Sequence, residues 1–341
     1  MAKLIRKVFL LCTLFALTLV GAGCGKQSGD TVVNIGYQVI PNTEAIVKSM
    51  GWHEETIKGA EVKWHSFDSG RDVNTALASG SIDIGLLGST LVANGISEGL
   101  DYQVIWIADV IGANEALVVK KSAGINSMED LKGKKIAVTF GSTTQYTLLG
   151  GLKANGIDPS EVNILDMQPP DMLAAWTRGD IDGGYVWHPT LQKMLDDQGQ
   201  ILITSGDLVE KGIVTADVIV VRNEFAKQHP EVVQDYIASQ IRAVELYRNN
   251  PDDAIAAVAK EFNITNEEAG TMMKELIWLS GDEQASSQYL GAANQPGEFS
   301  SVLEDTAHFL KDQSLIKSVP SSDAFKNAVS GEYIEKVMNG Q

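Results

Sequence analysis

The sequence predicts an α/β protein of two similar lobes, each a mainly parallel sheet flanked by helices, with two crossover segments between them. A short phrase occurs twice, as Gly80-Ser81-Ile82-Asp83-Ile84-Gly85 and as Gly179-Asp180-Ile181-Asp182-Gly183-Gly184. Each copy follows a helical run and opens an apolar strand that ends in a polar turn. Strand and helix patterns alternate over residues 32–221, which is typical of parallel sheets covered by helices. The chain length of 341 residues also exceeds one core and suits two domains.

Alternation of apolar and polar residues, with Gly or Asn at the breaks, gives the elements in order. The predicted strands are Val32–Tyr37, Ala60–Phe67, Ile82–Leu87, Tyr102–Val110, Ala116–Lys120, Lys135–Thr139, Val162–Asp166, Gly183–Val186, Ile201–Thr204 and Asp217–Val221. The predicted helices between them are Glu44–Gly51, Asp72–Ala78, Thr90–Ser97, Thr143–Ala154, Asp171–Thr177 and Leu191–Asp196.

From Asn223 onward the apolar spacing becomes helical. Helices are expected from Pro230, from Pro251, through Met272 and Met273, over Val302–Phe309 and over Ala324–Val337. The strand at Asp217–Val221 returns the chain to the first lobe. We therefore expect residues 31–115 and 217–341 to form the first lobe with the C-terminal helices, and residues 116–216 to form the second.

The N-terminus predicts export. Lys3, Arg6 and Lys7 precede an apolar run that is too short to span a membrane and ends in small residues before Cys24. This resembles a bacterial lipoprotein signal over residues 1–23, with Cys24 as the lipidated residue and residues 24–30 as a flexible leash. Gly21 departs from that pattern, since Leu or a similar residue is usual there. Ordinary secretion with cleavage nearby is the alternative.

Composition excludes several classes of protein. Removal of residues 1–23 leaves only Cys24, so no disulfide or cysteine-based metal site is possible in the remaining chain. The five histidines lack metal-ligand spacing, and neither a catalytic residue set nor a phosphate loop is present, so we expect no metal, cofactor or catalytic residue. The mature chain has 24 basic and 44 acidic residues, a net charge of −20, because three of the 27 basic residues lie in the signal. That charge argues against nucleic acid as a partner.

Ordered runs of residues across 32–245 carry a family resemblance. They are Phe67-Asp68-Ser69-Gly70, Leu77-Ala78-Ser79-Gly80, Gly88-Ser89, Asn114–Lys120, Ser142–Tyr146, Leu148-Leu149, Gln168-Pro169-Pro170, Ala174-Ala175-Trp176, Arg178–Gly183 and Tyr185-Val186-Trp187. They resemble the taurine-binding proteins of taurine ABC importers, which have the two-lobed periplasmic-binding-protein fold of type II. The resemblance implies a monomeric receptor on the outer face of the cytoplasmic membrane, or in the periplasm, that delivers taurine to a permease and an ATPase.

The sulfonate of taurine requires N–H and O–H donors, which unpaired amides at a helix N-terminus supply. Two segments fit, one in each predicted lobe. The first contains Gly88, Ser89 and Thr90, and the second contains Ser142, Thr143 and Thr144 before Tyr146. Ordinary helix capping would place the same residue types there, so capping remains the alternative.

The ammonium group of taurine requires a carboxylate or an aromatic face. Glu115 and Asp217 fall at the predicted crossovers beside apolar strands, where a charge is poorly solvated without a cation. An exposed strand end or an internal salt bridge is the alternative for each acid. Trp187 ends the second repeated strand and could stack on the ligand or lie in the core, and Gln38 follows the first strand.

Three functions remain open at this stage. A taurine or aminosulfonate receptor is favoured. A receptor of the same fold for other sulfonates, nitrate-like anions or a pyrimidine precursor is the second, although the two acids would repel a ligand without a cation. An enzyme on this fold is the third.

Overall fold

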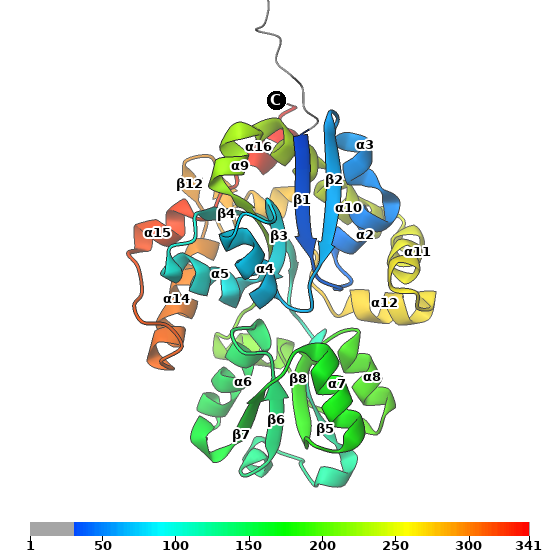
Figure 1. The fold of residues 1–341 in the computed structure, drawn as a ribbon, viewed down its shortest axis with the longest axis vertical. Helices are drawn as coiled ribbons and strands as arrows, with labels where there is room; N and C mark the ends of the chain where they lie inside the picture. Colours follow the sequence, from blue (N-terminus) through cyan, green and yellow to red (C-terminus); the bar gives the residue numbers. More distant parts are fainter. Residues whose placement is uncertain (1–30, 341) are drawn as a thin grey trace, which may run out of the picture. The chain divides into compact units, whose positions relative to one another are not determined.

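The computed structural model describes residues 31–340, and within them two five-stranded sheets each form the centre of a lobe (Figure 1). The first sheet has the order β2-β1-β3-β10-β4, made of β1 (Thr31–Tyr37), β2 (Ala60–Ser66), β3 (Ile84–Gly88), β4 (Tyr102–Val110) and β10 (Ala216–Arg222). The second has the order β7-β6-β8-β5-β9, made of β5 (Glu115–Lys120), β6 (Lys135–Val138), β7 (Asn163–Asp166), β8 (Gly183–Trp187) and β9 (Gly199–Thr204). The α/β architecture of two sheets flanked by helices is the one that the sequence predicts.

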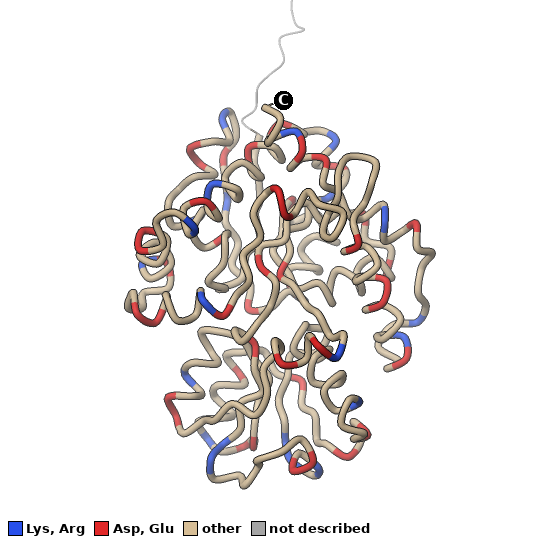
Figure 2. Tube along the Cα trace, turned by 180° about the vertical axis from the view of Figure 1, so that it is seen from behind, with Lys and Arg blue, Asp and Glu red and all other residues tan. Residues whose placement is uncertain are grey.

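One strand in each sheet runs against its neighbours. β10 is antiparallel to β3 and β4, and β5 is antiparallel to β8 and β9, whereas β1 with β3 and β6 with β8 are parallel. The chain passes from β4 to β5 through residues 111–114 and returns from β9 to β10 through residues 205–215. These two segments cross in the view of Figure 2, and they are hydrogen-bonded to each other: Ile111 N–H donates to the Thr215 carbonyl at 3.0 Å, and Gly206 N–H to the Gly112 carbonyl at 3.1 Å.

Helices cover both sheets. Those before the return strand are α2 (Thr43–Met50), α3 (Trp52–Thr56), α4 (Gly70–Ala78), α5 (Ser89–Glu98), α6 (Thr143–Ala154), α7 (Pro169–Arg178) and α8 (Thr190–Asp196), with short 3₁₀ turns at Lys121–Ala123, Met128–Leu131, Pro159–Glu161 and Gly206–Lys211. Those after it are α9 (Asn223–Gln228), α10 (Pro230–Asn249), α11 (Pro251–Phe262), α12 (Asn266–Lys274), α13 (Gly281–Gln284), α14 (Phe299–Asp312), α15 (Ser322–Asn327) and α16 (Glu332–Met338), with a ribbon of β11 (Gly291–Ala292) and β12 (Gln295–Pro296). No helix in residues 31–340 is long and apolar enough to cross a bilayer.

The repeated phrase folds the same way in both lobes. Gly80 follows α4 with φ +71° and Gly179 ends α7 with φ +80°, values in the left-handed region that glycine adopts without steric cost. Each glycine turns the chain from its helix toward a wholly buried strand, β3 or β8. The carboxyl ends of those two strands, at Gly88 and Trp187, bring their turns to the boundary between the lobes.

The prediction of one helix over Ala324–Val337 is wrong. The structure has α15 and α16 with a break between them, because the chain there pairs with β4: Val104 N–H donates to the Ala328 carbonyl at 2.8 Å, and Ser330 N–H to the Val104 carbonyl at 3.0 Å. The Ala328 carbonyl and the Ser330 amide are both used in pairing with β4, so the helix cannot continue through them.

Candidate ligand-binding site

A small cavity lies where the turns of the two lobes meet. Its volume is about 10 Å³, which is room for about one water molecule. Its lining residues are Gln38, Ile40, Gly70, Gly88, Leu91 and Asp217 from the first lobe, and Glu115, Ser142, Thr143 and Trp187 from the second. Both lobes therefore contribute polar side chains to one cavity.

Seven residues singled out from the sequence line this cavity: Gln38, Gly88, Glu115, Ser142, Thr143, Trp187 and Asp217. The other four have different surroundings. Ser89 Oγ accepts from Ala216 N–H at 3.2 Å, Thr144 Oγ1 lies 2.7 Å from Ser142 Oγ, the Tyr146 ring packs edge-on against Phe309 at 4.8 Å, and Thr90 is fully buried. Sequence reasoning missed Gly70 and the apolar wall formed by Ile40, which lies in a loop, and by Leu91, which lies in the first turn of α5.

The cavity contains two buried carboxylates from opposite lobes. Glu115 is the first residue of β5, and its Oε1 accepts from Thr143 Oγ1 at 2.5 Å while its Oε2 accepts from Ser205 Oγ at 3.3 Å. Asp217 is the second residue of β10 and is 4% exposed. Burial, with the nearby charge of Asp217, raises the pKa of Glu115 to about 8, and burial raises the pKa of Asp217 to about 7.

A third carboxylate, which the sequence did not single out, lies beside them. Asp109 near the end of β4 is fully buried, and Asn42 Nδ2 donates to its Oδ2 at 2.9 Å. Burial and the charge of Asp217 raise the pKa of Asp109 well above its usual range. Within residues 31–340 none of the three acids forms an ion pair with Lys, Arg or His, nor does the group have the arrangement of a metal site. A cation from a ligand would therefore relieve a large electrostatic penalty.

Two helix N-termini face the same cavity. Residues at the start of α5 (Gly88 and Leu91) and at the start of α6 (Ser142 and Thr143) line it. Gly88 provides α5 with no side-chain cap, whereas Ser142 caps α6 by accepting from Gln145 N–H at 3.3 Å. First-turn amides and the helix dipole favour an anion at such a place.

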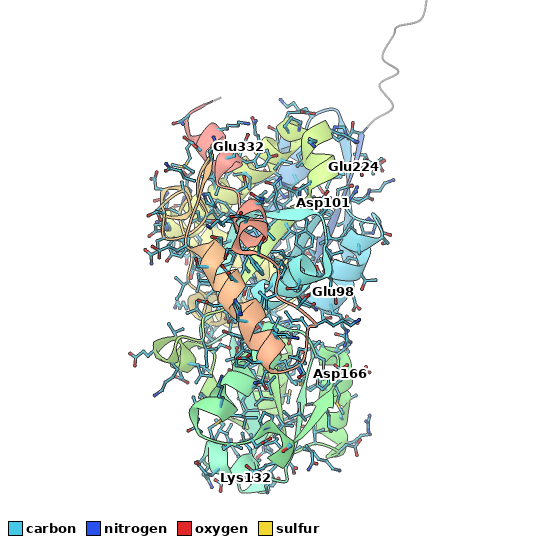
Figure 3. The ribbon with its side chains drawn as sticks, turned by 90° about the vertical axis from the view of Figure 1, so that its left-hand side faces the viewer. Glu98, Asp101, Lys132, Asp166, Glu224 and Glu332 are labelled. Carbon is cyan, nitrogen blue, oxygen red and sulfur yellow. The ribbon has the colours of Figure 1, made fainter. Side chains whose placement is uncertain are left out.

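The lobes are closed upon one another around the cavity. Arg71 of α4 pairs with Asp166 of β7 at 2.9 Å, and His188 of the second lobe lies 2.8 Å from Glu275 of the first. Asp166 is labelled in Figure 3, on the second lobe next to the boundary with the first. A Cβ on Gly88 would lie only 2.6 Å from Thr143 Cγ2, so the starts of α5 and α6 are in close contact. A ligand larger than one water therefore requires the lobes to separate before it enters.

The fold and the site together define a class: a two-lobed solute-binding protein with its polar site between the lobes. The comparisons with known proteins agree. Residues 35–254 match the family described as NMT1/THI5 like, so the chain belongs to that family.

Relatives of known sequence and structure support the same class. The chain is 39% identical over 283 residues to the taurine-binding periplasmic protein of Escherichia coli (strain K12), an alignment that covers 81% of this chain and 85% of that protein. Its fold matches the alkanesulfonate-binding protein from Xanthomonas axonopodis pv. citri bound to MOPS with a TM-score of 0.73 at 20% identity, covering 86% and 97% of the two chains. It also matches the periplasmic aliphatic sulphonate binding protein from Escherichia coli with a TM-score of 0.68 at 20% identity, covering 88% and 97%.

Proposed function

We propose that this chain is the extracytoplasmic substrate-binding component of an ABC importer and that it captures taurine between its lobes. The observation that carries the proposal is the pairing of uncompensated buried carboxylates with two helix N-termini in one cavity. Taurine bears a cation and a permanent anion separated by two methylenes, so it is complementary to both ends. The 39% identical relative named as taurine-binding supports the same ligand.

In this proposal the sulfonate is held at the starts of α5 and α6, with Thr143 Oγ1 as a hydroxyl donor. The ammonium group lies between Glu115 and Asp217, and Trp187, which is 8% exposed, covers the methylenes. Thr143 donates to Glu115 in the closed form, so ligand entry exchanges that hydrogen bond for one to the sulfonate. The lobe boundaries expected from the sequence, 31–115 with 217–341 and 116–216, remain part of the proposal with one change at each end: Glu115 begins β5 and goes with the second lobe, and Ala216 begins β10 and goes with the first.

Other sulfonates are the second candidate, because the solved neighbours include proteins named for alkanesulfonate and aliphatic sulphonate. The buried acids disfavour them, since a ligand with no cation leaves Glu115 and Asp217 uncompensated. The same argument disfavours nitrate-like anions. We also propose that the protein binds its ligand without converting it, as a monomer, and delivers it to a permease and an ATPase.

Calorimetry of residues 24–341 tests this function. The ligands are taurine, hypotaurine, ethanesulfonate, sulfate and nitrate. Taurine is expected to bind at least about 100-fold more tightly than ethanesulfonate, since each tenfold corresponds to about 1.4 kcal/mol and the two ligands differ only in the ammonium group. Equal affinity for the two would show that the acids do not select the ligand.

We further propose that Cys24 is acylated and anchors the protein to the membrane. Cys24 lies outside the described residues, so the proposal rests on the sequence of residues 1–30 alone. A terminus with two or more acyl chains anchors stably, whereas a chain this acidic has no membrane affinity of its own. The wild-type protein is expected in the membrane fraction of its host and Cys24→Ser in the soluble fraction. Equal membrane retention of the two would contradict anchoring at Cys24.

Gly88→Ala is expected to weaken taurine binding. The new Cβ meets Thr143 Cγ2 at 2.6 Å, so the variant cannot close without displacing α6. Such overpacking costs about 1–3 kcal/mol, or roughly five- to 150-fold in affinity. The Gly88 φ of −69° suits alanine, so folding of the first lobe is unaffected.

Thr143→Ser provides the matched control, because it removes Cγ2 and keeps the hydroxyl. The double variant Gly88→Ala/Thr143→Ser should recover most of the lost affinity, since the next Thr143 atoms lie at 3.5 Å and 3.6 Å. If the double variant binds no better than Gly88→Ala alone, the contact between Gly88 and Thr143 does not limit closure.

A further inference from the structure

Asp109 has a partner across the sheet that gives it a function beyond packing. In the antiparallel pair of β4 and β10, Asp109 lies directly opposite Asp217. Side chains that face each other in this way start about 4.5–5.5 Å apart at Cβ. The register between β10 and β4 shifts immediately after this pair, between Asp217 and Val218. This irregularity in the strand pairing is what places the two acids opposite each other.

The surroundings of Asp109 do not stabilise a negative charge on both its own carboxylate and that of Asp217. Its Oδ2 accepts from Asn42 Nδ2, whereas its Oδ1 is buried with no hydrogen-bond partner in the described structure. The charged groups that act on it are both acids, Asp217 on β10 and Glu115 on β5, and the group from the start of α2 is the neutral Asn42. Two adjacent buried carboxylates cannot both be ionised at low cost.

We propose that Asp109 and Asp217 share one proton in the ligand-free protein and release it to solvent when the ligand's cationic group reaches Asp217. The identity of that cation rests on the proposed function. With its proton the pair carries one negative charge. After the O–H bond breaks and the proton leaves, the pair carries two negative charges and faces one positive charge, so the net charge of the site is unchanged.

Asp109 acts in this exchange as a positioning residue. Both residues belong to the part of the chain that the structure describes, but only Asp217 lines the cavity. Asp109 therefore acts on the ligand through Asp217. A protonated partner donates a hydrogen bond to Asp217 and lowers the cost of burying it. The raised pKa values of both acids agree with a proton that is retained near neutral pH.

The exchange makes selectivity dependent on pH. Taurine remains an ammonium ion below about pH 9, so its own charge does not change. Below the pKa of the pair, a ligand that displaces one proton gains about tenfold in affinity for each unit by which the pH rises. Ethanesulfonate displaces no proton, so its affinity should not rise with pH.

Calorimetry at pH 6.5 in phosphate and in imidazole, whose ionisation enthalpies differ, measures the released protons. Wild-type protein is expected to release about one proton more per taurine bound than Asp109→Asn, since any proton that Glu115 loses is common to both proteins. The rise in taurine affinity between pH 5.5 and 7.5 should be correspondingly shallower in Asp109→Asn. Asp101→Asn, an exposed acid that precedes the same strand, is the matched control and should behave as wild type. No proton release from wild type, or equal release from Asp109→Asn, overturns the proposal.

A second measurement needs neither a ligand nor a folded variant. Ligand-free protein labelled with ¹³C at the aspartate carboxyl carbon is titrated by NMR. One protonated aspartate signal is expected to persist to pH 6.5, far above the ordinary range near 3.9. If this signal is present but taurine fails to bind, the shared proton stands and the proposed function fails. If every aspartate is ionised at pH 6.5, the shared proton is refuted whatever the ligand.

Discussion

Asp217→Asn is expected to lower taurine affinity by two or more orders of magnitude while changing ethanesulfonate affinity little. The substitution preserves shape and removes the charge that meets the ammonium group in the proposed complex. Breaking one side of a buried charge pair costs about 3–5 kcal/mol, and each tenfold in affinity is about 1.4 kcal/mol. Ethanesulfonate has no ammonium group, so loss of a buried negative charge does not harm it. Calorimetry with both ligands at pH 7.5 measures the difference.

Thr143→Ala is the complementary variant, because both ligands present the same sulfonate to the start of α6. It should weaken both of them. If Asp217→Asn instead weakens taurine and ethanesulfonate alike, Asp217 has a structural role and the ammonium group binds elsewhere.

The free energy of unfolding of the ligand-free protein is expected to fall by several kcal/mol as the pH rises from about 4 to 8. The pKa of Asp217 is raised from 3.8 to about 7 and that of Glu115 from 4.5 to about 8, mainly by burial. Between its unfolded and folded pKa, each acid binds a proton in the folded state and has lost it in the unfolded state. Stability is therefore complete below about pH 4 for these groups and falls by about 1.4 kcal/mol per pH unit and group until the folded pKa is passed.

Urea denaturation at pH 4.5, 6 and 7.5 measures this slope. Asp217→Asn should flatten it, because the variant has one fewer buried group that must ionise. Saturating taurine should also flatten it, because the ammonium group stabilises the ionised acids. A wild-type stability that is level or rises over this range would mean that the three acids are better solvated than their burial indicates.

The sequence predicted the positions of the cavity-lining turns because backbone rules place them. The repeated glycines at 80 and 179 set two identical helix-to-strand turns, and the ends of β3 and β8 follow from the apolar runs after them. It was harder to predict which of two adjacent residues in those turns lines the cavity. Successive residues of a first helical turn point about 100° apart, so Thr143 lines the cavity while Thr144 does not.

Asp109 could not be found in this way. It occupies a strand whose other residues are mostly apolar, and its importance depends on which residue of β10 lies opposite. That partner is fixed by a register shift between strands more than 100 residues apart in the sequence, a property of the assembled sheet. The break between α15 and α16 was missed for the same reason, since it depends on pairing with β4.

The hydrogen bonds between the two crossover segments restrict how the lobes can move. Residues 111–112 are tied to Thr215 and Gly206 by the two backbone bonds described above, so the lobes are joined by a coupled ribbon. Sliding of one segment along the other would break both bonds, so we expect the two segments to move together. The lobes should therefore open and close by rotation about a single hinge axis. Each time they close, Thr143 should come back into contact with Gly88. The two crossover segments thus align the binding groups of the two lobes, and this alignment does not depend on the ligand.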